Sequence, residues 1–106
     1  MRRILIVAFP DVQPLDVAGP AEVFTQAGGY TVEVVAPRAG PLPTGSGYAI
    51  VPLLALGDVR GPIDTLLVAG GAGTRDALRD DDLIGWLRAT APRAGRVASE
   101  IGRAHV

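Results

Sequence analysis

The chain has 106 residues, which is enough for one small domain with a single modest core. Its ten basic and eleven acidic residues are scattered and give a net charge of −1, so the composition excludes a basic surface of the kind that binds nucleic acid. Hydrophobic residues make up 48% of the chain and cysteine is absent, which indicates a globular protein without disulfides or thiolate metal sites, and we expect no metal and no cofactor.

The first apolar run, residues 4–9, is rich in β-branched residues and predicts a strand that is buried on both faces. It ends at Pro10, short of the roughly 7 to 15 apolar residues of a secretory signal core. No other run approaches the ~18 residues that a membrane-spanning helix needs. We therefore expect a cytoplasmic protein that does not contact a membrane.

A turn over residues 10–14 precedes a helix that we expect to begin with Pro20, because proline suits the first position of a helix. Gly28 and Gly29 end this helix. Residues 30–35 are β-prone and predict the second strand of a β-α-β unit, which requires a right-handed crossover.

Residues 40–52 combine prolines and glycines with a short β-prone run, and they predict a small hairpin or an excursion at the sheet edge. Residues 64–69 are again short and apolar, and they run into the glycine loop 70–74, which indicates a strand followed by a turn. Three aspartates open a predicted helix over residues 80–94, where the helix dipole favours negative charge.

Gly95 is placed to cap this helix, and residues 96–99 begin a fourth parallel strand. Strands that alternate with helices predict an α/β fold with a doubly wound sheet. In such sheets ligands bind beyond the carboxyl ends of the strands, near the point where the strand order reverses. The loops over residues 11–16 and 70–74 are expected at that edge.

Two segments carry a family resemblance. Residues 9–24 read FPDVQPLDVAGPAEVF, and residues 64–71 read DTLLVAGG. Together they resemble the ThiJ/PfpI superfamily, and most closely the amidase-like sensor domain of GlxA-type regulators, which carry an AraC-type DNA-binding region at their C-terminus. The resemblance covers residues 2–99. It implies that residues 1–99 are the N-terminal part of a flavodoxin-like, doubly wound parallel sheet, a partial three-layer α/β/α sandwich.

The sequence departs from this family where the strand from Arg96 would run into a sharp turn that holds a cysteine. The family's turn typically reads Val-Cys-Thr-Gly, whereas here Ser99 is followed by Glu-Ile-Gly. A common short-read sequencing adapter encodes residues 101–106 in frame, so we expect residues 100–106 to be a non-native tail. His105, the single histidine, lies in that tail and supports no inference about a site.

Asp16 is the strongest single candidate for a site. The resemblance implies an acidic side chain after the first strand and close to the cysteine, where it shares a proton with the thiolate or orients a water. The alternative is that Asp16 caps the helix, because aspartate accepts backbone N–H bonds at helix starts. The capping alternative is favoured for a chain that lacks the cysteine.

Gly70 and Gly71 resemble the family's Gly-Gly turn, whose backbone N–H groups face the reactive centre and stabilise an oxyanion. A tight strand-to-helix connection explains the two glycines equally well. We take Asp16, Gly70, Gly71 and Ala72 as the candidate ligand-binding residues of a vestigial site that has no catalytic residue in this chain. A dinucleotide-binding motif is rejected, because its third glycine position is Asp76.

Two further acidic features are weaker candidates. Glu22 lies near the start of its helix and could approach the site, but a solvated or capping carboxylate is the preferred interpretation. The aspartates at 80–82 are consecutive, and consecutive side chains on a helix point in different directions, which argues against a metal site.

We therefore expect a truncated ligand-sensing domain of a GlxA-type, AraC-family transcriptional regulator, without its DNA-binding region and without enzymatic activity. The expected partners are a small-molecule ligand and further copies of the chain, and DNA is expected only for a longer parent protein. The alternative is a fragment of an isonitrile-hydratase-like or other cysteine-dependent hydrolase.

Overall fold

The computed structural model describes residues 1–99, so the tail expected at residues 100–106 lies outside the described residues. Its main feature is a sheet of five parallel strands in the order β5-β2-β1-β6-β7. The strands are β1 (Arg2–Val7), β2 (Tyr30–Ala36), β5 (Leu54–Ala55), β6 (Thr65–Val68) and β7 (Arg96–Ser99). The expected α/β fold with a flavodoxin-like parallel sheet is confirmed.

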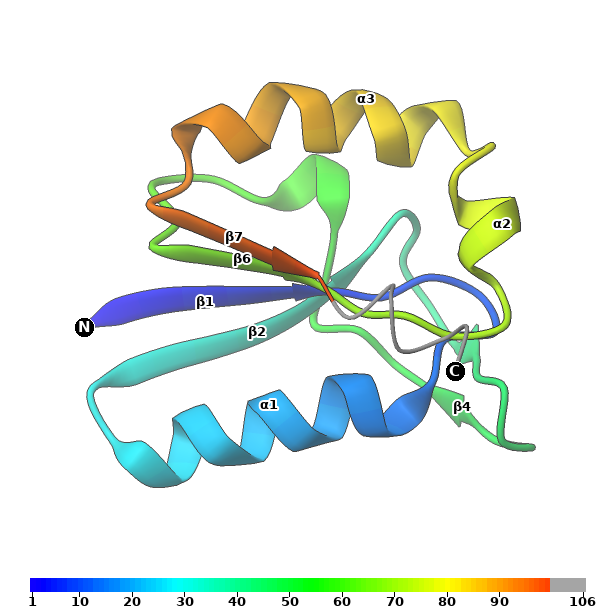
Figure 1. The fold of residues 1–106 in the computed structure, drawn as a ribbon, viewed down its shortest axis with the longest axis horizontal. Coiled ribbons are helices and arrows are strands. Elements are labelled where there is room, and N and C mark those ends of the chain that lie inside the picture. The colour runs from blue at the N-terminus through cyan, green and yellow to red at the C-terminus, as the bar shows by residue number, and fades with distance from the viewer. Residues whose placement is uncertain (100–106) are drawn as a thin grey trace.

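Helices cover both faces of this sheet, as Figure 1 shows. Helix α1 (Pro14–Ala27) lies on one face, and helices α2 (Thr74–Ala77) and α3 (Asp81–Thr90) lie on the other. Two short 3-10 turns are also present, η1 (Leu56–Asp58) before β6 and η2 (Ala91–Arg93) directly after α3. No helix within residues 1–99 has the length and apolar character needed to cross a membrane.

The core forms around β1, the middle strand. Its apolar residues from Ile4 to Val7 are at most 1% exposed, because neighbouring strands flank it on both sides and both of its faces are covered. Leu66 on β6, Val35 on β2 and Leu83 on α3 are buried against the same cluster. Each such side chain contributes roughly 1.5–3 kcal/mol when it leaves water, so this cluster holds the layers together.

Helix α1 begins earlier than the sequence predicts. Pro14, not Pro20, occupies the first turn, and Gln13 is the N-cap residue. Pro20 lies inside the helix, where it has no N–H to donate to the preceding turn. The prediction was wrong because either proline satisfies the rule for a helix start. The predicted end at Gly28 is confirmed, with a φ of +78° that suits glycine.

Very short elements account for most of the other differences. The predicted hairpin is present as β3 (Leu42–Pro43) paired antiparallel with β4 (Ala49–Ile50). Strand β5 and helix α2, which were not predicted, are two and four residues long. Elements of this length show no periodicity, so their sequence contains no signal for them.

Helix α3 confirms one expectation and corrects another. Asp80 is its N-cap, and its carboxylate accepts hydrogen bonds from the N–H groups of Asp82 at 3.1 Å and Leu83 at 3.3 Å. Gly95, however, does not cap the helix. Its N–H donates to Ile63, and a Cβ on it would lie 2.7 Å from the carbonyl oxygen of Asp64, so glycine is needed where the chain enters β7.

Candidate functional site

The candidate site lies at the carboxyl ends of β1 and β6, which are neighbours in the sheet. The loop after β1 and the loop after β6 therefore meet at one edge, where Figure 1 shows them at the same end of the molecule. The first loop leads into α1 and carries Asp16, and the second leads into α2 and carries Gly70, Gly71 and Ala72.

Asp16 is buried, with only 2% of its surface exposed. Its Oδ2 atom accepts a hydrogen bond from the backbone N–H of Gly70 at 3.3 Å. Because the N-cap of α1 is Gln13 and makes no side-chain cap bond, the interpretation of Asp16 as the helix cap is wrong. The structure brings Asp16 and Gly70 together, as a site at this edge requires.

The two loops are tied a second time through backbone groups. The N–H of Gln13 donates to the carbonyl oxygen of Gly70 at 2.8 Å. Gly70 thus donates to Asp16 and accepts from Gln13, so both of its backbone polar groups are satisfied by the start of α1. These two hydrogen bonds fix the position of the end of β6 relative to the start of α1.

Gly71 packs directly on the backbone of the first loop. Its φ of +138° is open only to glycine, and a Cβ at this position would lie 2.8 Å from the carbonyl oxygen of Asp11 and 2.9 Å from the carbonyl carbon of Val12. Gly73 approaches the carbonyl of Pro10 in the same way. The glycines therefore serve close packing of two loops, which supports the tight-connection interpretation of their role.

These contacts limit which N–H groups could stabilise an anion. The N–H of Gly70 is already used by Asp16. The antiparallel bridge between Val12 and Gly71 turns the N–H of Ala72 toward the carbonyl oxygen of Asp11, which also accepts from the N–H of Gly73 at 3.3 Å. If a ligand anion binds at this edge, the pair Gly70 and Gly71 does not supply its donors, because the Gly70 N–H is occupied by Asp16.

A third loop is joined to the site through Val12, which is fully buried. Val12 forms isolated bridges with both Thr44 and Gly71, and its carbonyl accepts from the N–H of Gly45 at 2.9 Å. Asp11, just before it, has a positive φ of +63°, which is uncommon for a residue other than glycine. The β3–β4 hairpin is thus part of the scaffold of the site.

The weaker candidates lie elsewhere. Glu22 is exposed on α1, where its carboxylate accepts from the Gln26 amide at 3.0 Å, as the solvated interpretation predicts. Asp80 caps α3, and residues 1–99 contain no cluster of three or more side chains that could hold a metal ion. The described chain therefore offers one buried carboxylate at this edge and no nucleophilic thiol, because the sequence has no cysteine.

The role of Arg3 is not predictable from the local sequence. Its Nε lies 2.7 Å from Glu33 on β2 in a half-buried ion pair, and its Nη1 donates to the carbonyl oxygens of Arg60 and Pro62. Its backbone N–H donates to Asp64 at 2.6 Å. An arginine at the start of a strand is usually solvated, so the local pattern contains no signal for this role.

Comparisons with known proteins show the family to which the chain belongs. The model of the DJ-1/PfpI family matches residues 2–105 of the chain. A protein of Streptomyces lividans, described as an uncharacterized protein in the cpoL 5′ region, is 32% identical over 101 residues, which cover 92% of this chain and 71% of that protein. Isonitrile hydratase of Pseudomonas putida is 29% identical over 97 residues, which cover 92% of this chain and 42% of the enzyme.

Solved structures show the same fold. A ThiJ/PfpI family protein from Pseudomonas syringae superposes with a TM-score of 0.86 at 26% identity, over 92% of this chain and 41% of that one. A DJ-1 superfamily protein from Agrobacterium tumefaciens superposes with a TM-score of 0.77 at 24% identity, over 93% of this chain and 53% of that one. The chain thus spans less than half the length of the Pseudomonas putida and Pseudomonas syringae relatives.

Proposed function

Because the chain belongs to the DJ-1/PfpI family, we propose that its residues 1–99 contribute to a small-molecule-binding domain and do not themselves catalyse a reaction. One observation carries the proposal. The only buried carboxylate at the carboxyl edge of the described sheet, Asp16, binds the backbone of Gly70, and the chain offers no thiol for it to activate. A ligand at this edge would meet the exposed part of the loop at Ala72, because Gly70 and Gly71 are buried.

The ligand-binding role that fits this arrangement is sensing. The motifs at residues 9–24 and 64–71 resemble those of GlxA-type regulators of the AraC family, in which such a domain precedes a DNA-binding region. A longer parent protein of this kind would bind a small molecule at the edge formed by Asp16 and residues 70–72, and would bind DNA through its further region. Self-association of the domain is the expected quaternary state.

The test is made on the parent protein. Its gene is sequenced beyond codon 99, and the full-length product is assayed for binding to DNA from its own upstream region. A helix-turn-helix pair together with sequence-specific DNA binding supports the proposal. A reading frame that ends roughly one domain later, with a product that leaves DNA unshifted, contradicts it.

A second candidate is favoured by the similarity to isonitrile hydratase of Pseudomonas putida, which spans 97 residues. In this case the parent would be a cysteine-dependent hydrolase or hydratase, and Asp16 would lie next to a thiolate supplied from beyond Ser99. The full-length protein would then convert an isonitrile, and Asp16→Asn would abolish turnover while preserving the fold. A full-length protein with DNA binding and no turnover excludes this candidate.

A further inference from the structure

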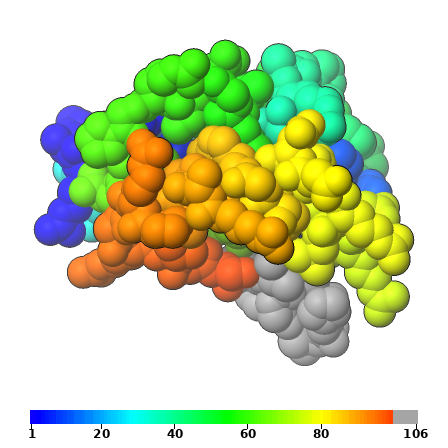
Figure 2. Space-filling view, turned by 90° about the horizontal axis from the view of Figure 1, so that it is seen from above, coloured from blue at the N-terminus to red at the C-terminus, as the bar shows by residue number. Residues whose placement is uncertain are grey.

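A second hollow lies at the opposite end of the sheet from Asp16 and Gly70. It has a volume of about 610 Å³ and lies between the C-terminal half of α3 with η2 and the segment that enters β6. Its lining residues are Val59, Arg60, Gly61, Pro62, Ile63, Trp86, Ala89, Thr90 and Arg93. Figure 2 looks onto this face and shows the segment before β6, in green, beside α3, in orange.

This hollow is separate from the site described above. Ile63 lies before the start of β6, whereas Gly70 follows its end. At about 3.3 Å per residue, the extended chain between them spans roughly 20 Å, so one small ligand could not contact both. The inference therefore does not depend on the proposed function.

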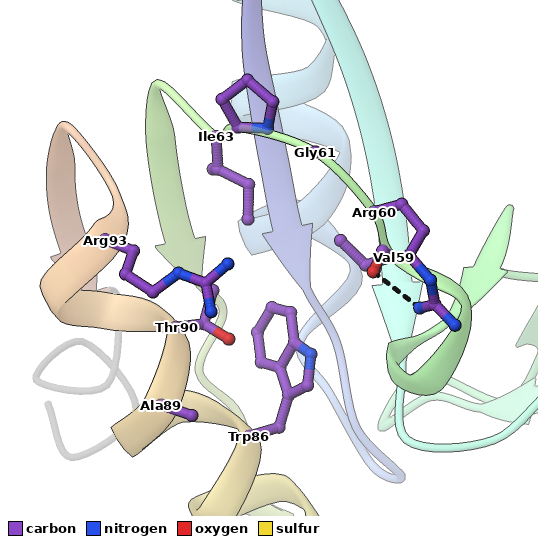
Figure 3. Close-up of a pocket in the computed structure, with 9 residues that line it drawn as sticks. Val59, Arg60, Gly61, Ile63, Trp86, Ala89, Thr90 and Arg93 are labelled. Atoms are coloured by element: carbon purple, nitrogen blue, oxygen red, sulfur yellow. Dashed lines mark hydrogen bonds between the residues drawn. The ribbon is translucent and has the colours of Figure 1, made fainter.

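The side chains that line the hollow carry positive charge only. Two of its lining residues are arginines and none is acidic. Within residues 1–99, Arg93 forms no ion pair and donates no hydrogen bond, so its guanidinium is available to a ligand. Arg60 is held in place, because its Nη1 donates to the carbonyl oxygens of Gly57 at 2.6 Å and Val59 at 2.9 Å. In Figure 3 the Arg60 guanidinium turns toward the Val59 carbonyl and away from Trp86, so Arg93 is the arginine placed to meet a ligand anion beside the ring.

The rest of the lining suits the aromatic ring of a ligand. Figure 3 shows the indole ring of Trp86 in the middle of the hollow, with Arg93 and Arg60 on either side of it in this view and the Ile63 side chain pointing inward. Thr90 adds a hydroxyl group beside Arg93. Flat rings pack favourably against an indole, and a guanidinium binds a carboxylate through two parallel hydrogen bonds.

One wall of the hollow is fixed before any ligand arrives. Arg3 reaches from β1 to the carbonyl oxygens of Arg60 and Pro62, and its own guanidinium is anchored by Glu33 at 2.7 Å. Gly61, between these two carbonyls, has a φ of +86° that favours glycine. A wall held in this way reduces the ordering cost that a ligand would have to overcome.

We propose that this hollow binds a small aromatic carboxylate, with the ring against Trp86 and the carboxylate on Arg93. Its volume lies within the range of about 300–1,000 Å³ that is usual for small-molecule sites. The requirement for a ring comes from Trp86 and Ile63, and the requirement for a negative charge comes from Arg93. A neutral ring or an aliphatic carboxylate satisfies only one of them.

The test uses the fluorescence of Trp86, which is the only tryptophan of the chain. The chain is fused to a tryptophan-free carrier to keep it in solution and is titrated with para-nitrobenzoate, whose ring quenches a tryptophan that it contacts. We expect saturable quenching, and binding that is about fivefold or more weaker for the neutral para-nitrobenzyl alcohol, the scale of one partly solvated charge-assisted hydrogen bond.

Matched variants locate the binding. Arg93→Gln should weaken para-nitrobenzoate binding by about fivefold or more, whereas Arg88→Gln, on the exposed side of the same helix, should change it less than about twofold. Both variants should keep the circular dichroism spectrum of the parent chain. The proposal is overturned if quenching is linear and unsaturable, if the alcohol binds as tightly as the acid, or if the two variants bind equally.

Discussion

The carboxylate of Asp16 lies 3.3 Å from the backbone nitrogen of Gly70, and this hydrogen bond joins the first turn of α1 to the end of β6. Both partners are buried. A buried N–H group without an acceptor is costly, so the bond stabilises the packing of two elements that are distant in sequence. The residue that resembles a family functional residue therefore also has a structural role in this chain.

The first prediction concerns this bond. Asp16→Ala leaves the Gly70 N–H without its acceptor and should reduce the free energy of unfolding by about 1–3 kcal/mol. Asp16→Asn keeps an oxygen at the same place, so it should reduce the free energy of unfolding clearly less than Asp16→Ala does. Urea denaturation of the chain fused to the tryptophan-free carrier, followed by the fluorescence of Trp86, measures both, with Asp58→Ala, an exposed acid, as the control. Equal losses for Ala and Asn would show that the hydrogen bond is not what matters.

The second prediction concerns the close approach of Gly71 to residues 11–13. Gly71→Ala should cost about 3 kcal/mol or more, because the new Cβ meets backbone atoms that cannot move independently. Gly47→Ala is the matched control, since Gly47 also has a positive φ, of +86°, but has open space around it. Its cost should be about 1–2 kcal/mol, that of the backbone conformation alone. Similar losses in thermal unfolding for the two variants would contradict the steric argument.

The third prediction compares two arginines. The ion pair of Arg3 and Glu33 has side chains that are 20% and 17% exposed, whereas Arg38, paired with Asp80, is 68% exposed. Arg3→Met should lower stability by about 1–3 kcal/mol, because Glu33 and the carbonyl of Arg60 lose a partner. Arg38→Met should change it by less than about 1 kcal/mol. A larger effect at Arg38 in denaturant titrations would refute this order.

Continuous apolar runs explain why much of the sheet could be predicted. Residues 4–9 and 66–69 are buried and all of these positions are apolar, so both strands can be recognised in the sequence. The same reasoning failed for β5 and α2, whose few residues are fixed by pairing with β2 and by the glycine loop, which are tertiary contacts. The start of α1 was wrongly predicted at Pro20, because Pro14 also suits the first turn of a helix.

The position of the candidate site could be predicted from the sequence, but the hydrogen bonds within it could not. Parallel strands bring their carboxyl ends to one edge, so the loops carrying Asp16 and Gly70 had to meet. The identity of the partner atoms depends on the register of β1 with β6 and on the packing of Gly71, which no local pattern contains. The anchoring role of Arg3 was missed for the same reason, since its partners are 30 or more residues away.

The fourth prediction is that the purified chain has no turnover. Without cysteine, and with Asp16 bonded to a backbone amide, the described residues offer no activated nucleophile for amide or isonitrile chemistry. Product formation from either substrate class should equal that of a buffer blank. The prediction would be wrong if reproducible turnover were observed and were lost in Asp16→Asn.

The fifth prediction concerns β7, which is exposed along its whole length. Val97 is 54% exposed, although strands of a parallel sheet are normally covered on both faces. Each apolar side chain left in water forgoes roughly 1.5–3 kcal/mol, and within residues 1–99 β7 is an end strand of the sheet, a position that favours pairing with other chains. Even one such loss is a sizeable part of the 5–15 kcal/mol that stabilises a typical domain.

We therefore expect the free chain to associate or aggregate and to bind a hydrophobic dye strongly. Val97→Lys should reduce both dye fluorescence and light scattering, because a charge on an edge strand opposes pairing. Val51→Lys is the control, since Val51 is also exposed, at 71%, but lies by the β3–β4 hairpin and not on the main sheet. A sharp, dispersed proton NMR spectrum at monomer mass would contradict the prediction, because it would mean that the chain folds stably with β7 uncovered.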